Sequence, residues 1–169
     1  MEGTAHQAVI RGRQVAITAE VGVVTENSVE VMHGSHLFRF SSVNTGTEHA
    51  VALTGPVGSV NIADVGRTVR YHPALAPVGA NVSIVQALDD HLLRVRTYER
   101  GVEAETLSCG SGAVAAVVIA RLAGSISAGP VSVLNEAGTP LIVDCPADPR
   151  NQAIWLTGPA EVAYLGGLP

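Results

Sequence analysis

Apolar and polar residues alternate along most of the chain with the two-residue period of β-strands. Runs of this kind are rich in β-branched or aromatic residues and end at Gly, Ser, Asn or Pro. They cover residues 14–24, 28–34, 36–46, 49–55, the pair 81–89 and 91–99 joined by a turn at Asp89–Asp90, and 130–138, 139–146 and 153–166. The chain is therefore predicted to be built mainly of strands.

Two segments depart from this alternation and predict helices. Within residues 61–73, three apolar residues recur at helical spacing before a proline ends the run. The second segment, roughly Gly110–Ala123, is apolar almost throughout and is followed by Gly124. A single cysteine, Cys109, stands directly before this second helix.

Composition narrows the class of protein. The 169 residues are enough for one ordinary domain or two small ones that share strands, and 47% of them are apolar. No run of eighteen or more apolar residues predicts a membrane helix, and the N-terminus has no signal-peptide core. We therefore expect a soluble, cytoplasmic protein that does not act at a membrane. The net charge of −5 and the scattered basic residues argue against nucleic-acid binding.

The chain has six histidines and two cysteines, and none of them stands at metal-ligand spacing. We therefore expect no metal. Two cysteines do not predict a disulfide framework in a chain of this size, which favours a reduced thiol. Cys145 lies late in a predicted strand and is interpreted as structural.

A weak internal repeat relates residues 14–22 to residues 130–138, and a further match aligns Gly34 with Gly158. The thiol helix precedes the second copy, whereas only thirteen residues precede the first. If the repeat is real, a cysteine-bearing helix is missing upstream. The alternative is that two short hairpins resemble each other by chance.

Cys109 combines two chemical features. The N-terminal end of a helix carries unsatisfied N–H groups and a partial positive charge, which favours a thiolate over a thiol. The N–H groups of Gly110, Ser111 and Gly112 also form a cradle for a carboxylate. A base beside an anion site suits the removal of a proton next to a substrate carboxylate. The alternative is a small buried cysteine without chemistry.

Four segments of the sequence resemble segments of a known protein family. "RTYERGVEAETLSCGSGA" (96–113) is similar to the second active-site segment of diaminopimelate epimerases, and weaker matches lie at 43–51, 79–86 and 156–166. The resemblance implies an α/β (α+β) fold of two similar halves, each a curled sheet around a helix. It also implies amino-acid metabolism, including lysine biosynthesis, without pyridoxal phosphate or another cofactor. In that family two cysteines face opposite sides of the substrate α-carbon, one as base and one as acid.

The resemblance assigns roles to residues of this chain. Cys109 corresponds to the second catalytic cysteine. Gly110 and Ser111 correspond to the N–H donors for the substrate α-carboxylate. Glu99 and Arg100 correspond to the pair that holds the substrate's amino and distal carboxylate groups.

Asn81 and His49 correspond to a ligand of the substrate's distal end and to the histidine of an Asn-Pro-His turn. Here that turn reads Thr47-Glu48-His49, and a threonine does not offer the paired donor and acceptor of an amide. Glu48 adds a negative charge where a distal carboxylate would lie. The substrate amino acid therefore stays open.

The family's first cysteine segment has no counterpart in this sequence. Residues 1–40 are therefore predicted to be partial first-half strands that a partner completes, and residues 41–169 the second half with the thiol helix. The leading hypothesis is one subunit of a split, heterodimeric amino-acid epimerase or racemase, with the first cysteine on a protein partner.

Three alternatives stand beside it. A homodimer could place two copies of Cys109 across one substrate. A non-catalytic or regulatory amino-acid-binding subunit would keep only the anion cradle. A cysteine hydrolase would need His49 within hydrogen-bond reach of the Cys109 sulfur.

Overall fold

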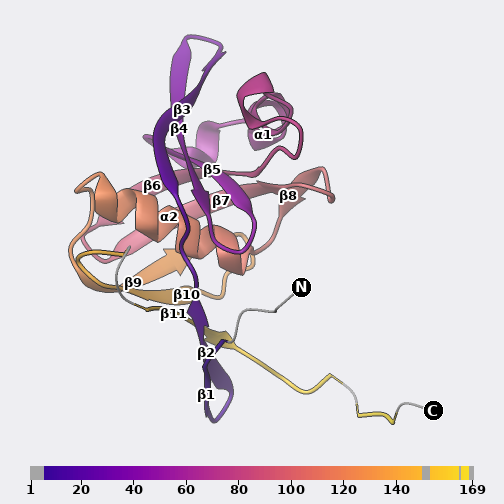
Figure 1. Ribbon diagram of the computed structural model, residues 1–169, viewed down its shortest axis with the longest axis vertical. Coiled ribbons are helices and arrows are strands. Elements are labelled where there is room, and N and C mark those ends of the chain that lie inside the picture. Colours follow the sequence, from indigo (N-terminus) through magenta and orange to yellow (C-terminus); the bar gives the residue numbers. More distant parts are fainter. Residues whose placement is uncertain (1–5, 150–152, 164, 168–169) are drawn as a thin grey trace.

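The computed structural model describes residues 6–149, 153–163 and 165–167. They form one continuous mixed sheet that curls around helix α2 (Gly110–Leu122), with helix α1 (Ile62–Arg70) packed on its outer side (Figure 1). The strands are β1 (Ala8–Arg11), β2 (Gln14–Ala19), β3 (Val24–His33), β4 (His36–Asn44), β5 (Glu48–Leu53), β6 (Asn81–Asp89), β7 (Leu92–Glu99), β8 (Ala104–Thr106), β9 (Gly129–Leu134), β10 (Leu141–Cys145) and β11 (Ile154–Pro159). Two 3-10 turns, Val57–Ser59 and Pro73–Leu75, flank α1.

The sheet runs in the order β1-β2-β11-β10-β9-β7-β6-β5-β4-β3, with β8 paired to β7. Two neighbouring pairs are parallel, β5 with β6 and β7 with β9. Parallel neighbours need a crossover connection. Helix α1 lies in the connection from β5 to β6, and α2 lies in the connection from β7 to β9.

The two ends of this sheet are joined by a very short connection. Strand β2 lies near one end of the order and β3 forms the other end, yet only residues 20–23 separate them in the chain. Such a segment spans at most about 18 Å. The sheet must therefore bend back on itself, and the N–H of Gly22 fastens this connection to the carbonyl of Asn44 at 2.8 Å.

Helix α2 fills the space inside the curl. From Gly112 to Ala120 it consists of Gly, Ala, Val and Ile, and every residue from Gly112 to Arg121 is buried. A helix that is apolar all round has no solvent face and is stable only when surrounded. Strands from β4 to β7 and β10 to β11 contact it on different sides.

A second, smaller core lies between α1 and the opposite face of the sheet. Ile62, Val65 and Val69 of α1 are buried against a cluster that includes Phe40 and Tyr98. Their spacing of three and four residues places them on one face of the helix. The helical interpretation of residues 61–73 is confirmed.

The predicted fold class is confirmed, with strands dominating and a sheet curled around a central helix. Strands β1 and β8 were not predicted, because four and three residues are too short to show an alternation. The thiol helix begins at the predicted Gly110 and ends at Leu122, one residue before the predicted Ala123, and Gly124 follows with a left-handed φ of 70°.

The predicted boundary at residue 40 falls inside β4, and one sheet continues across it. The side chains of Ala19, Val21 and Val24 pack against the same core as α2. That a partner completes residues 1–40 stays a prediction. The two repeat copies also differ, because β9 and β10 form a hairpin while β2 and β3 lie far apart in the sheet order.

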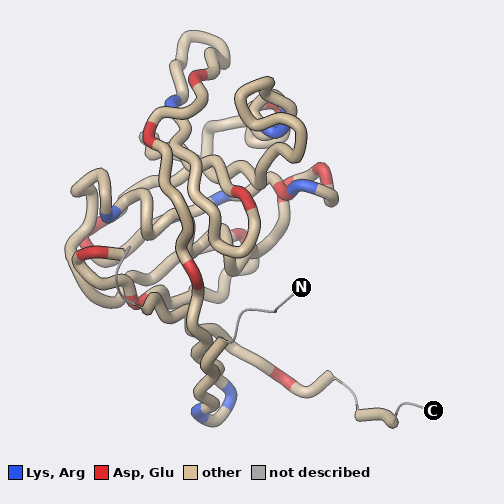
Figure 2. Tube along the Cα trace, viewed as in Figure 1, with Lys and Arg blue, Asp and Glu red and all other residues tan. Residues whose placement is uncertain are grey.

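Charged residues are spread over the described part of the chain, with acidic and basic positions interspersed and no continuous basic face (Figure 2). Neither helix within residues 6–149, 153–163 and 165–167 is long and apolar enough to cross a membrane.

The contact of α1 with the sheet generates a stability prediction. A Cβ at Gly66 would lie 2.4 Å from the Cβ of Tyr98, so Gly66→Ala should lower the free energy of unfolding by about 1–3 kcal/mol despite its better helix propensity. Gly58→Ala is the matched control, because no heavy atom lies within 4 Å of its added Cβ. Urea unfolding midpoints measure both, and equal midpoints would contradict this packing.

Candidate active site

Three strands and one helix meet at the edge of the sheet where the predicted site residues lie. Strands β5 and β6 are parallel, so their first residues share this edge, and His49 is paired with Asn81. Strand β7 is antiparallel to β6 and therefore ends here at Glu99. The N-terminal end of α2 reaches the same edge, since Ser111 contacts the β4–β5 turn through Thr45.

Cys109 is the N-cap residue of α2. Its backbone is extended, with φ −131° and ψ 109°, and its Sγ accepts a hydrogen bond from the Gly112 N–H at 3.4 Å. A Cβ at Gly112 would lie 3.1 Å from this sulfur and 3.3 Å from Thr97 Oγ1. The first N–H groups of the helix have no intrahelical acceptor. The half-buried thiol thus lies beside a potential anion site.

A chain of polar atoms connects the thiol to the buried His49. The Ser111 hydroxyl lies 3.6 Å from Cys109 Sγ and 3.1 Å from His49 Nε2. Thr45 Oγ1 donates to the Ser111 carbonyl at 3.3 Å and holds the first turn of the helix in place. The imidazole therefore contacts Ser111 and not the sulfur, so the arrangement lacks the direct Cys–His contact of a cysteine hydrolase.

The surroundings of Cys109 shift its pKa in opposite directions. Burial raises the pKa of the thiol, and the nearby Glu99 carboxylate raises it further. Hydrogen bonds from Ser111 and the Gly112 N–H lower the pKa in part. The sequence predicted that the helix N-terminus favours the thiolate, whereas burial and Glu99 shift the resting group toward the thiol.

His49 is fully buried and carries no charge near neutral pH. Burial, with the Arg100 guanidinium as a second cause, lowers the pKa of His49 to about 4. Among the described residues its Nδ1 has no hydrogen-bond partner. The fold therefore encloses Nδ1, while Nε2 on the other side of the ring contacts Ser111.

Arg100 contacts two of the other predicted site residues, Asn81 and Thr47. Its backbone N–H donates to Asn81 Oδ1 at 2.9 Å, and its Nη2 donates to Thr47 Oγ1 at 2.9 Å. Its Nη1 is 3.4 Å from the Gly79 carbonyl. Asn81 is buried, so its position is fixed by this contact and by the strand around it. Glu48 Oε1 accepts a hydrogen bond from Asn44 Nδ2 at 2.5 Å.

Glu99 is held beside the thiol by a threonine. Thr106 Oγ1 donates to Glu99 Oε1 at 2.5 Å, across the pairing of β7 with β8. The sequence analysis did not identify Thr106 or Thr45. Thr106 lies opposite Thr97 in the pairing of β7 with β8, and the sequence did not predict β8. Thr45 is 66 residues from Ser111, and no spacing pattern in the sequence relates the two.

The structure brings all of the predicted site residues to one edge of the sheet. They are Cys109, Gly110, Ser111, Glu99, Arg100, Asn81, Thr47 and His49. Cys145 is not among them: it is fully buried, and its carbonyl accepts from Arg121 in the last turn of α2, at the opposite end of the helix. The two thiols therefore cannot act on one substrate within this chain.

The arrangement offers complementary groups to an amino acid. Helix N–H groups suit a carboxylate, Glu99 suits an ammonium group, and Arg100 suits a second anion. Cys109 can exchange a proton with a carbon held between them.

The chain is similar to known proteins over most of its length. Residues 41–163 match the family model described as Diaminopimelate epimerase. The chain is 40% identical to the diaminopimelate epimerase of Aquifex aeolicus (strain VF5) over 126 residues, 75% of this chain and 44% of that protein. It is also 40% identical to the one of Methanocella arvoryzae over 133 residues, 79% and 45% of the two chains.

A solved structure shares the fold. The hydroxyproline epimerase from Agrobacterium vitis superposes with a TM-score of 0.65 at 17% identity, covering 90% of this chain and 52% of that one. The chain thus spans about half the length of the relatives it matches.

The surroundings of the thiol predict its titration. Cys109 should react with iodoacetamide along a pH profile whose midpoint lies above the ordinary thiol pKa of about 8.5. Glu99→Gln should move the midpoint to lower pH, since removing the carboxylate charge stabilises the thiolate. Peptide mass spectrometry distinguishes Cys109 from Cys145. Glu48→Gln changes the net charge equally and should leave the midpoint unchanged. A wild-type midpoint below the ordinary range would contradict this assignment.

The buried His49 predicts a pH dependence of stability. Its folded pKa of about 4 lies below the ordinary value of 6.5, so the unfolded chain binds the proton more readily between these values. Stability should therefore fall as pH falls from about 6.5 to 4, by at most about 3 kcal/mol. Urea unfolding should show this loss reduced in His49→Gln and kept in His33→Gln. An unchanged pH dependence in His49→Gln would refute this role.

Proposed function

The chain belongs to the diaminopimelate epimerase family, and from this premise we propose that it carries one of the two acid–base groups of a cofactor-independent amino-acid epimerase or racemase. Cys109 is that group. The observation that carries the proposal is the position of its half-buried thiol between the first turn of α2 and the Glu99 carboxylate.

The substrate is oriented by charges of opposite sign. Its α-carboxylate lies on the N–H groups of Gly110 and Ser111, and its ammonium group lies against Glu99. Arg100, fixed by Asn81 and Thr47, meets an anionic distal end. These contacts place the α-carbon next to the Cys109 sulfur, where helix N–H dipoles stabilise charge that develops on the carboxylate.

Proton transfer then runs between the α-carbon and Cys109 Sγ. As a thiolate Cys109 removes the α-proton, and as a thiol it returns a proton to the carbanion. Because burial and Glu99 raise its pKa, the resting group is the thiol. A substrate ammonium group beside Glu99 neutralises that charge and lowers the pKa of the Cys109 thiol, so that more of it is thiolate. The Ser111 hydroxyl stabilises the sulfur in either form.

Inversion also needs an acid on the opposite face of the substrate. Because Cys145 lies at the far end of α2, we place the second thiol on a polypeptide segment outside these 169 residues.

We infer that this segment docks on an apolar stripe beside the thiol. Ile17 is paired with Leu156, and Leu156 lies 3.1 Å from the position of a Cβ on Gly110. Ile10 and Ile17 face the same side of the β1–β2 hairpin and are 74% and 40% exposed. The stripe thus extends from the core past the thiol, and its exposure supports a partner surface there. A second copy of the chain is the competing occupant.

Exchange of the substrate α-proton tests the role of Cys109. The chain is incubated in D2O with amino acids that include the diaminopimelate stereoisomers, and deuterium uptake and configuration are followed by NMR. We expect uptake that rises with pH and falls at least about 100-fold in Cys109→Ser. Cys145→Ser is the matched control and should keep the activity.

The stereochemical result identifies the second acid. Uptake without inversion supports an opposing group outside the chain, whereas uptake with inversion supports two copies of Cys109 across one substrate. Exchange that survives Cys109→Ser would overturn the proposed role. Binding without any exchange would instead support a regulatory amino-acid-binding subunit.

A further inference from the structure

The turn that carries Arg100 has an unusual backbone. It connects β7 to β8, and the Glu103 N–H closes it by donating to the Glu99 carbonyl at 2.8 Å. Gly101 and Glu103 both have left-handed backbone, with φ of 89° and 58°. Glycine adopts this region readily, whereas a glutamate there is uncommon. The contacts of the Glu103 side chain must therefore offset the cost of this backbone.

The Glu103 carboxylate accepts hydrogen bonds from three parts of the fold. Its Oε1 accepts from the Gly101 N–H within the turn at 3.1 Å and from Arg70 Nε of α1 at 3.2 Å. Its Oε2 accepts from the hydroxyl of the buried Tyr98 on β7, also at 3.2 Å. Hydrogen bonds to an ionised group are stronger than those between neutral groups. One carboxylate thus fastens the turn to helix α1 and to the sheet.

Arg70 also fixes the segment that contacts the Arg100 guanidinium. Its Nη1 donates to the Val78 carbonyl at 3.0 Å. Gly79 follows with a left-handed φ of 66°, and a Cβ there would clash with the Arg70 guanidinium. The Gly79 carbonyl accepts from Arg100 Nη1 at 3.4 Å. Arg70 therefore holds both the turn that carries Arg100, through Glu103, and the segment before β6, through Val78.

The Arg100 guanidinium forms no ion pair with a carboxylate of the described residues. Its Nη1 and Nη2 donate to the Gly79 carbonyl and to Thr47 Oγ1, which are neutral acceptors. Arg70 and Arg96, by contrast, each pair with a glutamate. A bound anion would give Arg100 the charged partner that the fold gives the other two.

We propose that Glu103 and Arg70 are positioning residues that hold the Arg100 guanidinium toward the anionic distal end of the substrate. Neither touches the substrate, because both act through the turn and through the segment before β6. The inference rests on the proposed function, in which Arg100 meets that anion. Disturbing either residue should therefore weaken the binding of amino acids with a distal anion and leave the contacts of the α-carboxylate and α-ammonium groups unchanged.

Two amino acids that differ only in the distal carboxylate test this role. L-lysine is LL-diaminopimelate without one carboxylate, and isothermal titration calorimetry measures both dissociation constants. The wild-type chain should bind diaminopimelate at least about tenfold more tightly than lysine. Glu103→Gln and Arg70→Gln should each reduce this preference at least about fivefold and change the affinity for lysine less than about twofold. Glu103→Gly should lose the preference as well, although glycine suits the left-handed backbone better.

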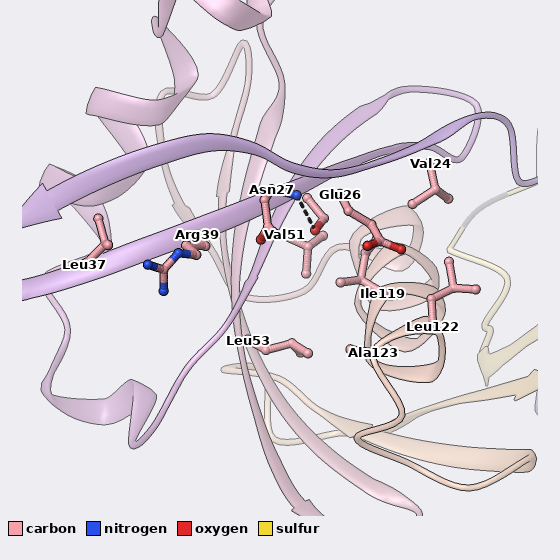
Figure 3. A pocket seen from close by; sticks show the side chains of 11 residues that line it. Val24, Glu26, Asn27, Leu37, Arg39, Val51, Leu53, Ile119, Leu122 and Ala123 are labelled. Carbon is pink, nitrogen blue, oxygen red and sulfur yellow. Dashed lines mark hydrogen bonds between the residues drawn. The ribbon is translucent and has the colours of Figure 1, made fainter.

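Two variants are matched controls. Glu105→Gln removes a carboxylate that is 28% exposed, close to the 32% of Glu103, and that pairs with Arg96 at 2.7 Å. Arg39→Gln removes an arginine whose Nε pairs with Glu30 at 2.9 Å. Arg39 lies at a groove lined by the last turn of α2 and by β3, β4 and β5, at the opposite end of α2 from Cys109 (Figure 3). Both variants should keep the wild-type preference for diaminopimelate.

The outcomes separate this role from the proposed function. The role is overturned if Glu103→Gln keeps the preference for diaminopimelate, or if it weakens lysine as much as diaminopimelate, which would indicate a general structural effect. A retained preference together with α-proton exchange at Cys109 would refute this role alone. Binding of neither amino acid by the wild-type chain would refute the proposed function and this role together.

Discussion

Burial of α2 on every side is the constraint on which the rest of the structure depends. Each fully buried Val or Ile contributes about 1.5–3 kcal/mol relative to exposure, and α2 carries several of them around its whole circumference. If strands covered only one side of the helix, some of these side chains would be exposed in every orientation of the helix. The curled sheet and the short connection at residues 20–23 are the consequence, and they fix both ends of the helix in space.

A helix packed on every side has a fixed position, and so does its N-terminus. Cys109 therefore lies at the edge of the sheet where β5 and β6 begin and β7 ends. The pairing of these strands places His49, Asn81 and Glu99 at the same edge. The small residues that follow Cys109 have a specific purpose. Gly112 leaves room for the sulfur beside Thr97, because a Cβ there would lie 3.1 Å from the sulfur and would make the thiol shift by a few tenths of an ångström.

Features that depend on neighbouring residues could be predicted from the sequence, and contacts between residues far apart in the chain could not. Strands, both helices and the thiol at a helix mouth follow from local patterns, and the matching segments brought in Glu99, Arg100 and Asn81. The contact of His49 with Ser111 joins residues 62 positions apart, and nothing local encodes it. The membership of residues 14–40 in the sheet around α2 was also hidden, because closure is a property of the whole curl and not of any one strand.

The thiol illustrates why the local pattern alone misjudges chemistry. A helix N-terminus favours the thiolate, but its field acts over one turn and is opposed by the loss of water that accompanies burial. Glu99, held by Thr106, adds a negative charge to the same side. A substrate ammonium group would remove this charge effect while its carboxylate occupies the helix end. Burial and Glu99 therefore favour the thiol in the free site, and under the proposed function a bound substrate would lower the thiol pKa by neutralising Glu99.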